Sequence, residues 1–191
     1  MDVITLAFPE HVRFTDDELF AICASNKDLK IERNKQGKLI IMSPVGGLSS
    51  YYESELGGNL WAWNKQKGLG IVLSASAGFI LKDGSILSPD AAWIEKNRWN
   101  NLKIVEKEKF IPLCPDFVAE IRSQSDSIKN LQEKMFDWMK NGCRLGWLID
   151  PIERAAYVYR NTQQPVQVNF NEVLNGETVL PDFNFQLSTF E

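Results

Sequence analysis

Glu120 is a carboxylate in the middle of a segment, Phe117–Arg122, that otherwise has the composition of an inner β-strand. Alternate side chains of a strand point to opposite faces, so Val118, Glu120 and Arg122 share one face. A carboxylate there is costly to bury unless a cation or hydrogen-bond donors pair with it. Arg122 is one candidate partner, in which case the two residues form only an ion pair.

Asp90 is the second acidic residue that the local pattern does not require. It follows Ser-Pro in LSPDAAWI and stands directly before an apolar strand, Ala91–Glu95. Carboxylates on adjacent strands can hold Mg²⁺, while phosphate oxygens and water fill its other coordination positions. The alternative is a purely structural role, in which the Asp90 side chain accepts a hydrogen bond from nearby backbone in a turn.

Two further residues lie beside the buried stripes of predicted helices. Lys134 is at the margin of the apolar stripe in the helix after Glu120, where its long side chain can reach toward the sheet and bring an ammonium near the carboxylates. A solvated helix lysine fits this position equally well. Glu55 flanks the stripe of an earlier helix and is a weaker candidate for a third carboxylate.

The composition excludes several kinds of site. The only histidine, His11, leaves little room for a catalytic triad or a histidine-based nuclease, and the three cysteines have none of the spacings of a zinc site. A metal would therefore be held by oxygen. The formal net charge of -4 argues weakly against a dedicated nucleic-acid coat protein. No apolar stretch reaches the roughly 18 to 20 residues of a membrane span, and we expect a cytoplasmic protein.

Three helices are predicted from capping residues and helical periodicity. Thr15 and Glu18 have the spacing of a capping box, which predicts that the first helix follows Thr15. The second helix is expected to be capped by Ser49 or Ser50 and to end at Gly68, and the third to be capped by Asp126 or Ser127 and to end at Gly142.

The order of the predicted strands and helices indicates an α/β fold around a mixed sheet. We expect a single domain over residues 1–191. The strand at Phe117, the third helix and the apolar strand Leu145–Ile149 follow one another in the order of a right-handed parallel crossover. The remaining expected strands are Leu29–Asn34 and Lys38–Ser43 in a hairpin, Ile71–Ser76, Gly78–Leu81, Ala91–Glu95, Ala156–Tyr159, and Val166–Phe170 and Phe183–Leu187 at the sheet's edge.

Three segments carry a resemblance to a known family: LSPDAAWI, PDFVAEIRSQSDSIKNLQEKM and NGCRLGWLIDP. They resemble the family described as "putative restriction endonuclease", a branch of the PD-(D/E)xK nuclease superfamily. The likeness covers nearly the whole chain and is most specific from Pro115 to Pro151. It implies a restriction-endonuclease-like mixed sheet flanked by helices.

The resemblance also implies the roles of single residues. Asp90 matches the central metal-binding aspartate, Glu120 the acidic residue of the E-x-K motif, and Glu55 the helical acidic residue. Asp90, Glu120 and the Ile121 carbonyl would hold Mg²⁺ or Mn²⁺. One departure is that Arg122 occupies the position of the motif lysine, and arginine holds its proton too tightly to act as a base. In this branch the lysine is thought to lie in the following helix, which indicates Lys134 and leaves Arg122 as a phosphate contact.

The resemblance therefore implies a metal-dependent endonuclease that acts on DNA. Cutting both strands usually needs two active sites, so we expect a homodimer. The alternative is a non-catalytic module that binds nucleic acid or protein on a degenerate nuclease fold. Six tryptophans could stack on bases, but tryptophans at helical or strand spacing usually lie in cores. Close approach of Asp90, Glu120, Lys134 and Glu55 in one cleft would favour the enzyme.

Overall fold

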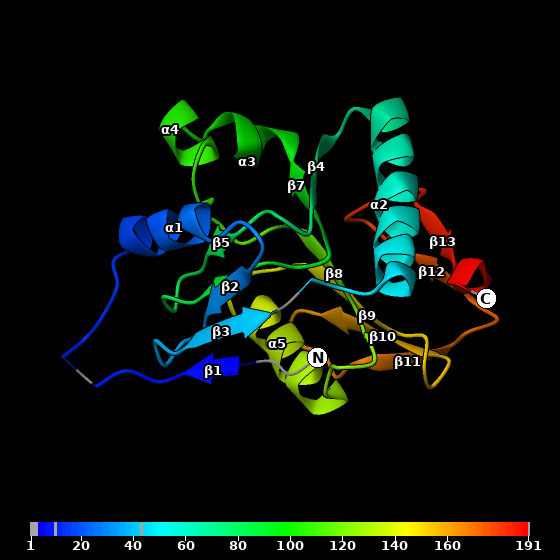
Figure 1. Cartoon of the computed structure of the whole chain (residues 1–191). Coiled ribbons are helices and arrows are strands. Elements are labelled where there is room, and N and C mark those ends of the chain that lie inside the picture. The colour runs from blue at the N-terminus through cyan, green and yellow to red at the C-terminus, as the bar shows by residue number, and fades with distance from the viewer. Residues whose placement is uncertain (1–3, 10, 43, 191) are drawn as a thin grey trace.

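The centre of the protein is a mixed six-stranded sheet, seen in a computed structural model that describes residues 4–9, 11–42 and 44–190 (Figure 1). Its strand order is β11-β10-β9-β8-β7-β4, and β8 and β9 are parallel while the other neighbours are antiparallel. The strands are β4 (Gly70–Ser74), β7 (Ala91–Glu95), β8 (Phe117–Ile121), β9 (Leu145–Asp150), β10 (Ala155–Arg160) and β11 (Val166–Asn169).

Two helices cover the two faces of this sheet. Helix α2 (Gly47–Lys67) packs Leu56, Leu60 and Trp63 against one face, together with Phe117 and other residues of matching parity. Helix α5 (Ile128–Lys140) packs Met135, Trp138 and Met139 against the other face. Since alternate residues of β8 face opposite ways, Val118 lies on the α5 side, and so does Glu120.

A second sheet of five strands packs with helix α1 (Asp16–Ser25) beside the central sheet. Thr15 caps α1 in the predicted capping box with Glu18. The strand order of this second sheet is β1-β3-β2-β6-β5. Its strands are β1 (Ile4–Leu6), β2 (Lys30–Arg33), β3 (Leu39–Met42), β5 (Phe79–Ile80) and β6 (Ile86–Leu87). Because β6 leads through a short segment into β7, this sheet lies next to the end of β7 where Asp90 lies.

The remaining elements are short. Helices α3 (Lys96–Asn100) and α4 (Ile104–Lys107) follow β7, and near the C-terminus a two-stranded sheet of β12 (Val173–Asn175) and β13 (Asn184–Gln186) precedes a 3₁₀ turn, Leu187–Phe190. This C-terminal part packs beside α2 on the same core (Figure 1).

The predicted α/β fold, the hairpin of β2 and β3, and the parallel crossover through α5 are confirmed. Two local predictions were wrong. Helix α2 begins at Gly47, with the extended Gly46 as its cap, so Ser49 and Ser50 lie inside its first turns. The strand predicted at Phe183–Leu187 does not extend the central sheet, because β13 pairs with β12. Ser43, the predicted end of the hairpin, is outside the described residues.

No helix in the described part of the chain is long and apolar enough to cross a membrane. The prediction of one domain over residues 1–191 stays a prediction.

Candidate active site

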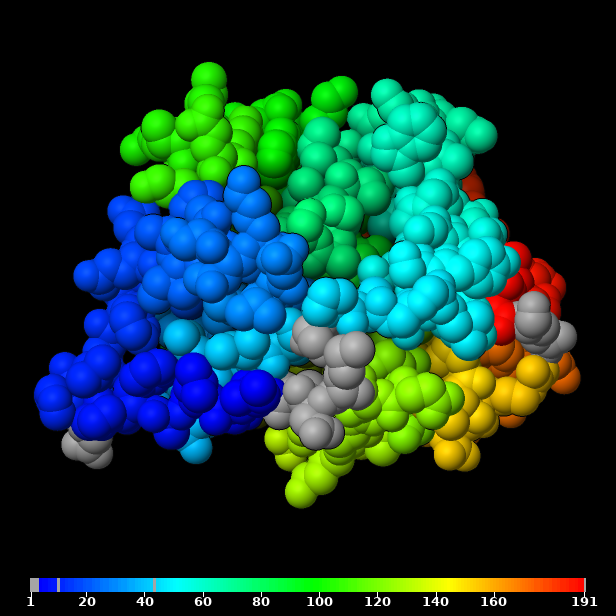
Figure 2. Space-filling view, viewed as in Figure 1, coloured from blue at the N-terminus to red at the C-terminus, as the bar shows by residue number. Residues whose placement is uncertain are grey.

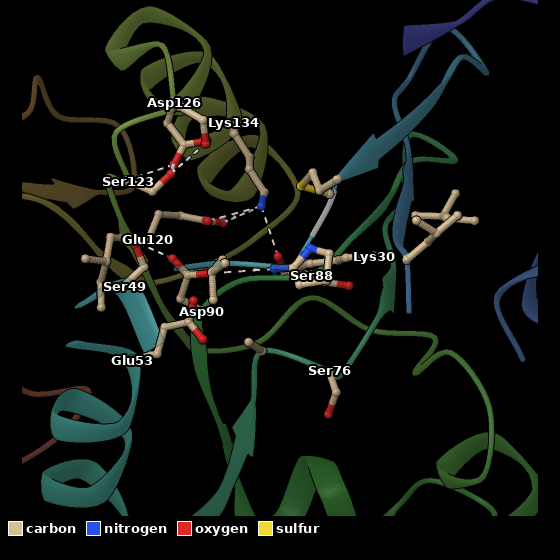
Figure 3. A pocket seen from close by; sticks show the side chains of 18 of the residues that line it. Lys30, Ser49, Glu53, Ser76, Ser88, Asp90, Glu120, Ser123, Asp126 and Lys134 are labelled. Atoms are coloured by element: carbon tan, nitrogen blue, oxygen red, sulfur yellow. Dashed lines mark hydrogen bonds and ion pairs between the residues drawn. The ribbon is translucent and has the colours of Figure 1, made fainter. Parts of the chain in front are cut away.

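A cleft of about 630 Å³ opens where the second sheet meets the end of β7 and β8. Its lining includes Asp90, Glu120 and Lys134, three of the residues that the sequence singled out, together with Lys30 and Glu53. Figure 3 shows these side chains directed toward one another. They come from β2, α2, β8, α5 and the segment before β7. The sequence-predicted Glu55 and Arg122 do not line this cleft.

Asp90 directly precedes β7 and lies against β8, the strand that carries Glu120. The β7–β8 register ends with Ala91 paired to Ala119, one residue from Asp90 and one residue from Glu120. The Asp90 N–H donates to the Ala119 carbonyl at 3.0 Å, and the carboxylate Oδ2 of Asp90 accepts the Ile121 N–H at 2.8 Å. Asp90 is thus held by the backbone of β8, and its second oxygen faces the cleft.

Glu120 is almost completely buried, with 2% of its surface exposed. Its Oε1 accepts the indole N–H of Trp138 at 2.9 Å and lies 2.9 Å from the Lys134 ammonium. Its Oε2 lies 3.1 Å from the same ammonium. Burial raises the pKa of Glu120 to about 7, because the loss of hydration outweighs the attraction of Lys134.

Lys134 lies among acceptors that match its three N–H groups. It donates to Glu120, to Glu32 Oε1 at 2.9 Å and to the Ser88 carbonyl at 2.9 Å. Burial alone would lower the pKa of this ammonium, but the charges of Glu120, Glu32 and Asp90 raise it well above the ordinary lysine value. Lys134 is therefore a permanent positive charge rather than a proton acceptor.

Strand β2 contributes two side chains that the sequence analysis missed. Lys30 lies 3.6 Å from Asp90 Oδ1, and Glu32, which is 3% exposed, pairs with Lys134 and accepts the Ser88 N–H at 2.9 Å. The sequence did contain a signal for these two residues. Lys30 and Glu32 flank Ile31, so the strand has a charged face opposite the face that carries Ile31. Charged residues on such a face usually meet solvent, and only the second sheet's position brings them to the cleft.

Glu53, and not the predicted Glu55, is the carboxylate that α2 brings to the cleft. Glu53 is half-buried beside Asp90, and burial, followed by the Asp90 charge, raises the pKa of Glu53 to about 7. Glu55 instead bonds the Asn59 amide of its own helix at 3.0 Å. The periodicity contained this signal, since Glu53 is two turns before the buried Leu60 and within about 20° of it around the helix.

Arg122 is engaged away from Glu120. Its guanidinium donates to Asp150 Oδ2 at 2.8 Å and to the Asp126 carbonyl at 3.3 Å, and Asp150 is 1% exposed. The strand ends at Ile121, so the period of two no longer fixes the direction of Arg122. The same-face pair of Glu120 and Arg122 considered from the sequence is therefore wrong, and Lys134 is the partner of Glu120.

The donors in the cleft fit a hard divalent cation. They are carboxylate oxygens, and Oδ1 of Asp90 and Oε2 of Glu120 each retain lone-pair capacity. The Ile121 N–H donates to Asp90 Oδ2, and in an extended strand the carbonyl of the same residue points to the same side, toward Asp90. Among the described residues no group of three or more His, Cys, Asp or Glu side chains is already arranged to hold a metal.

Comparison with known proteins agrees with the predicted family and the fold. The family model Uma2, described as "Putative restriction endonuclease", matches residues 16–188, and the chain belongs to this family. The resemblance noted in the sequence is thereby confirmed. No curated protein matches the chain.

A solved structure gives the same answer for the fold. The crystal structure of a putative nuclease belonging to DUF820 from Anabaena variabilis ATCC 29413 is similar to this chain with a TM-score of 0.77 and 20% sequence identity. The match covers 93% of this chain and 97% of that chain. At this identity the likeness shows that the two chains share a fold.

Proposed function

We propose that this protein is a metal-dependent endonuclease that hydrolyses phosphodiester bonds in DNA. The observation that carries the proposal is the meeting of Asp90, Glu120 and Lys134 in one cleft, with Lys134 2.9 Å from Glu120. Membership of a family described as restriction endonucleases supports the same reaction class.

In this proposal Asp90, Glu120 and the Ile121 carbonyl hold Mg²⁺ or Mn²⁺, and Glu53 takes the helical position expected for Glu55. Such an ion, when bound, polarises the scissile phosphate and lowers the pKa of a coordinated water. A cation beside Glu53 and Asp90 would also offset the repulsion that raises the pKa of Glu53.

Lys134 supplies fixed positive charge at the reacting phosphate. Because its pKa is raised, it stays protonated and stabilises the negative charge that develops as water attacks. Glu32 and Ser88 each accept a hydrogen bond from the ammonium, so these two groups still hold Lys134 when it exchanges its Glu120 contact for a phosphate oxygen.

The test is cleavage of plasmid and single-stranded DNA with Mg²⁺, Mn²⁺ or EDTA. Wild type should cut only with metal, and Asp90→Asn, Glu120→Gln and Lys134→Met should each lose at least a hundredfold in rate. Glu55→Gln is the matched control, because it removes one negative charge from α2 outside the cleft. Loss of cutting in Glu55→Gln but not in Asp90→Asn would contradict the proposed site.

A second candidate is a module that binds nucleic acid or protein without cutting. The observation in its favour is that the three acceptors of Lys134 are all protein groups. Metal-independent, salt-sensitive retention of DNA with no cleavage would select it. Cutting both strands of a duplex would need two sites, which a homodimer would provide, and sedimentation during cleavage would test for that dimer.

A further inference from the structure

The cleft continues into a groove along α2 that the proposed chemistry does not use. This groove encloses about 510 Å³ between α2 and the segment around β4, and it shares Glu53, Asp90, Ala75 and Ser76 with the cleft. Figure 2 shows the α2 residues, in cyan, meeting the green residues that follow β4 near the middle of the displayed face. A strand whose phosphate lies at Asp90 therefore has a path leading away from the acids.

Trp61 lies at the wall of this groove and is 55% exposed. The other tryptophans, all within the described residues, are buried or half-buried, and four of them belong to the two large cores. Exposing an indole to water forfeits a large apolar area that burial would have stabilised. Because Glu53 and Asp90 line the same groove, Trp61 differs from an apolar residue scattered on the surface.

A cation accompanies the exposed ring. The Lys65 ammonium lies 5.1 Å from the centroid of the Trp61 ring, one helical turn further along α2. An aromatic face and a neighbouring ammonium match the two parts of a nucleotide, a base that stacks and a phosphate that carries negative charge.

Two glycines of α2 are among the residues that line the groove. Gly57 and Gly58 line it in the interior of α2, where each glycine is less favourable than alanine by about 1 kcal/mol. A Cβ at either position would meet no atom within 4 Å, so packing inside the described protein does not demand glycine. Glycine instead leaves room for another chain to approach the helix closely.

From the groove, its continuity with the acids and the Trp61–Lys65 pair, we propose that this groove binds an unpaired nucleic-acid strand beside the scissile phosphate. Trp61 stacks on a base of that strand and Lys65 contacts its backbone. That this strand is the substrate rests on the proposed nuclease function. The inference goes further in assigning single-stranded or locally opened nucleic acid, since a base inside a duplex offers no free face for stacking.

The experiment measures binding separately from cleavage. Fluorescence anisotropy with a 20-nucleotide oligothymidylate, the matching oligouridylate and a duplex of equal length, in EDTA and at fixed salt, compares wild type with Trp61→Ala, Trp61→Phe and Lys65→Met. We expect about tenfold weaker binding of the single strands for Trp61→Ala, partial recovery for Trp61→Phe, and little change for the duplex. The two oligonucleotides distinguish DNA from RNA.

The variant Gly58→Leu tests whether filling the groove weakens binding when the fold is intact. Leucine is the better helix former, so the variant should melt no lower than wild type while its side chain fills the groove and weakens single-strand binding. Unchanged single-strand binding in both Trp61→Ala and Gly58→Leu would overturn the inference even if the protein cuts DNA. Binding through Trp61 without any cutting would instead leave the inference standing and reject the nuclease. Loss of a dimer in Trp61→Ala with unchanged oligonucleotide binding would identify a subunit interface and also overturn it.

Discussion

Asp90, directly before β7, is tied to the strand that carries Glu120, because the Ile121 N–H donates to the Asp90 carboxylate. The two carboxylates are therefore positioned by sheet hydrogen bonds rather than by flexible loops. Either carboxylate can therefore be substituted while the other stays in its position.

Metal binding should depend on Asp90. Adding Mg²⁺ to the wild type should raise its melting temperature, by an amount equivalent to about 2.7 kcal/mol at a concentration 100 times the Kd. Asp90→Asn keeps an oxygen that accepts the Ile121 N–H, so it should fold but show little of this increase. Thermal melts in EDTA and in a Mg²⁺ series measure both effects. Equal Mg²⁺ shifts in the two proteins would place the ion elsewhere.

Glu53 should make stability depend on pH. Its pKa is raised to about 7 in the folded protein from 4.5, so between these pH values the folded state binds more protons than the unfolded state. The unfolding free energy contributed by Glu53 consequently falls as pH rises from about 4.5 to 7. Glu53→Gln should gain stability relative to wild type over that window, on the order of 1 kcal/mol because solvent screens a half-exposed group.

Urea unfolding of wild type and Glu53→Gln at pH 5 and pH 8, both in EDTA, measures this difference. Glu55→Gln serves as the control on the same helix. A Glu53→Gln difference that is the same at both pH values would show that Asp90 and burial do not perturb Glu53.

Removing the ammonium of Lys134 should destabilise the protein as well as stop cleavage. Lys134→Met leaves Glu120 and Glu32 buried without their cation, and breaking a buried ion pair costs about 3 kcal/mol or more. Because Glu120, whose pKa is already raised by burial, can bind a proton and lose its charge, the loss should be larger at pH 8 than at pH 5. Lys129→Met, at an exposed position of α5, should change stability little in the same denaturation series.

Glu32 should act through Lys134. Glu32→Gln retains an oxygen for the Ser88 N–H but withdraws one negative charge from the ammonium. We expect kcat to fall about tenfold while KM and the melting temperature change little, since substrate binding does not involve Glu32. An equal loss in Glu133→Gln, an exposed acid of α5, would indicate a general effect of charge.

Arg122 should prove structural. Arg122→Met leaves Asp150 buried and unpaired, so the unfolding free energy should fall by about 3 kcal/mol, with cleavage per folded molecule retained. Asp150→Asn in the same chain should restore part of that loss. Cleavage that disappears from fully folded Arg122→Met would instead support the phosphate contact considered from the sequence.

The sequence predicted the parts of the site that depend on local pattern. Glu120 stood out because a strand alternates, and Lys134 because a helix turns by a fixed angle per residue. Lys30 and Glu32 could not be found in this way, since β2 reaches the cleft only through the position of a second sheet. Arg122 was misplaced because its strand ends one residue earlier, and Glu55 because its neighbour Glu53 is closer to the line of Leu60.

The contact between Lys134 and Glu32 joins residues 102 positions apart in the chain. Closing so long a loop is entropically unfavourable until the surrounding structure has formed, so this pair belongs to the late events of folding. Before that point the lysine side chain is not held by Glu32, and the developing charge on a phosphate would meet an unfixed ammonium. A nascent or partly unfolded chain would thus lack nuclease activity, and catalysis would begin only with the completed fold.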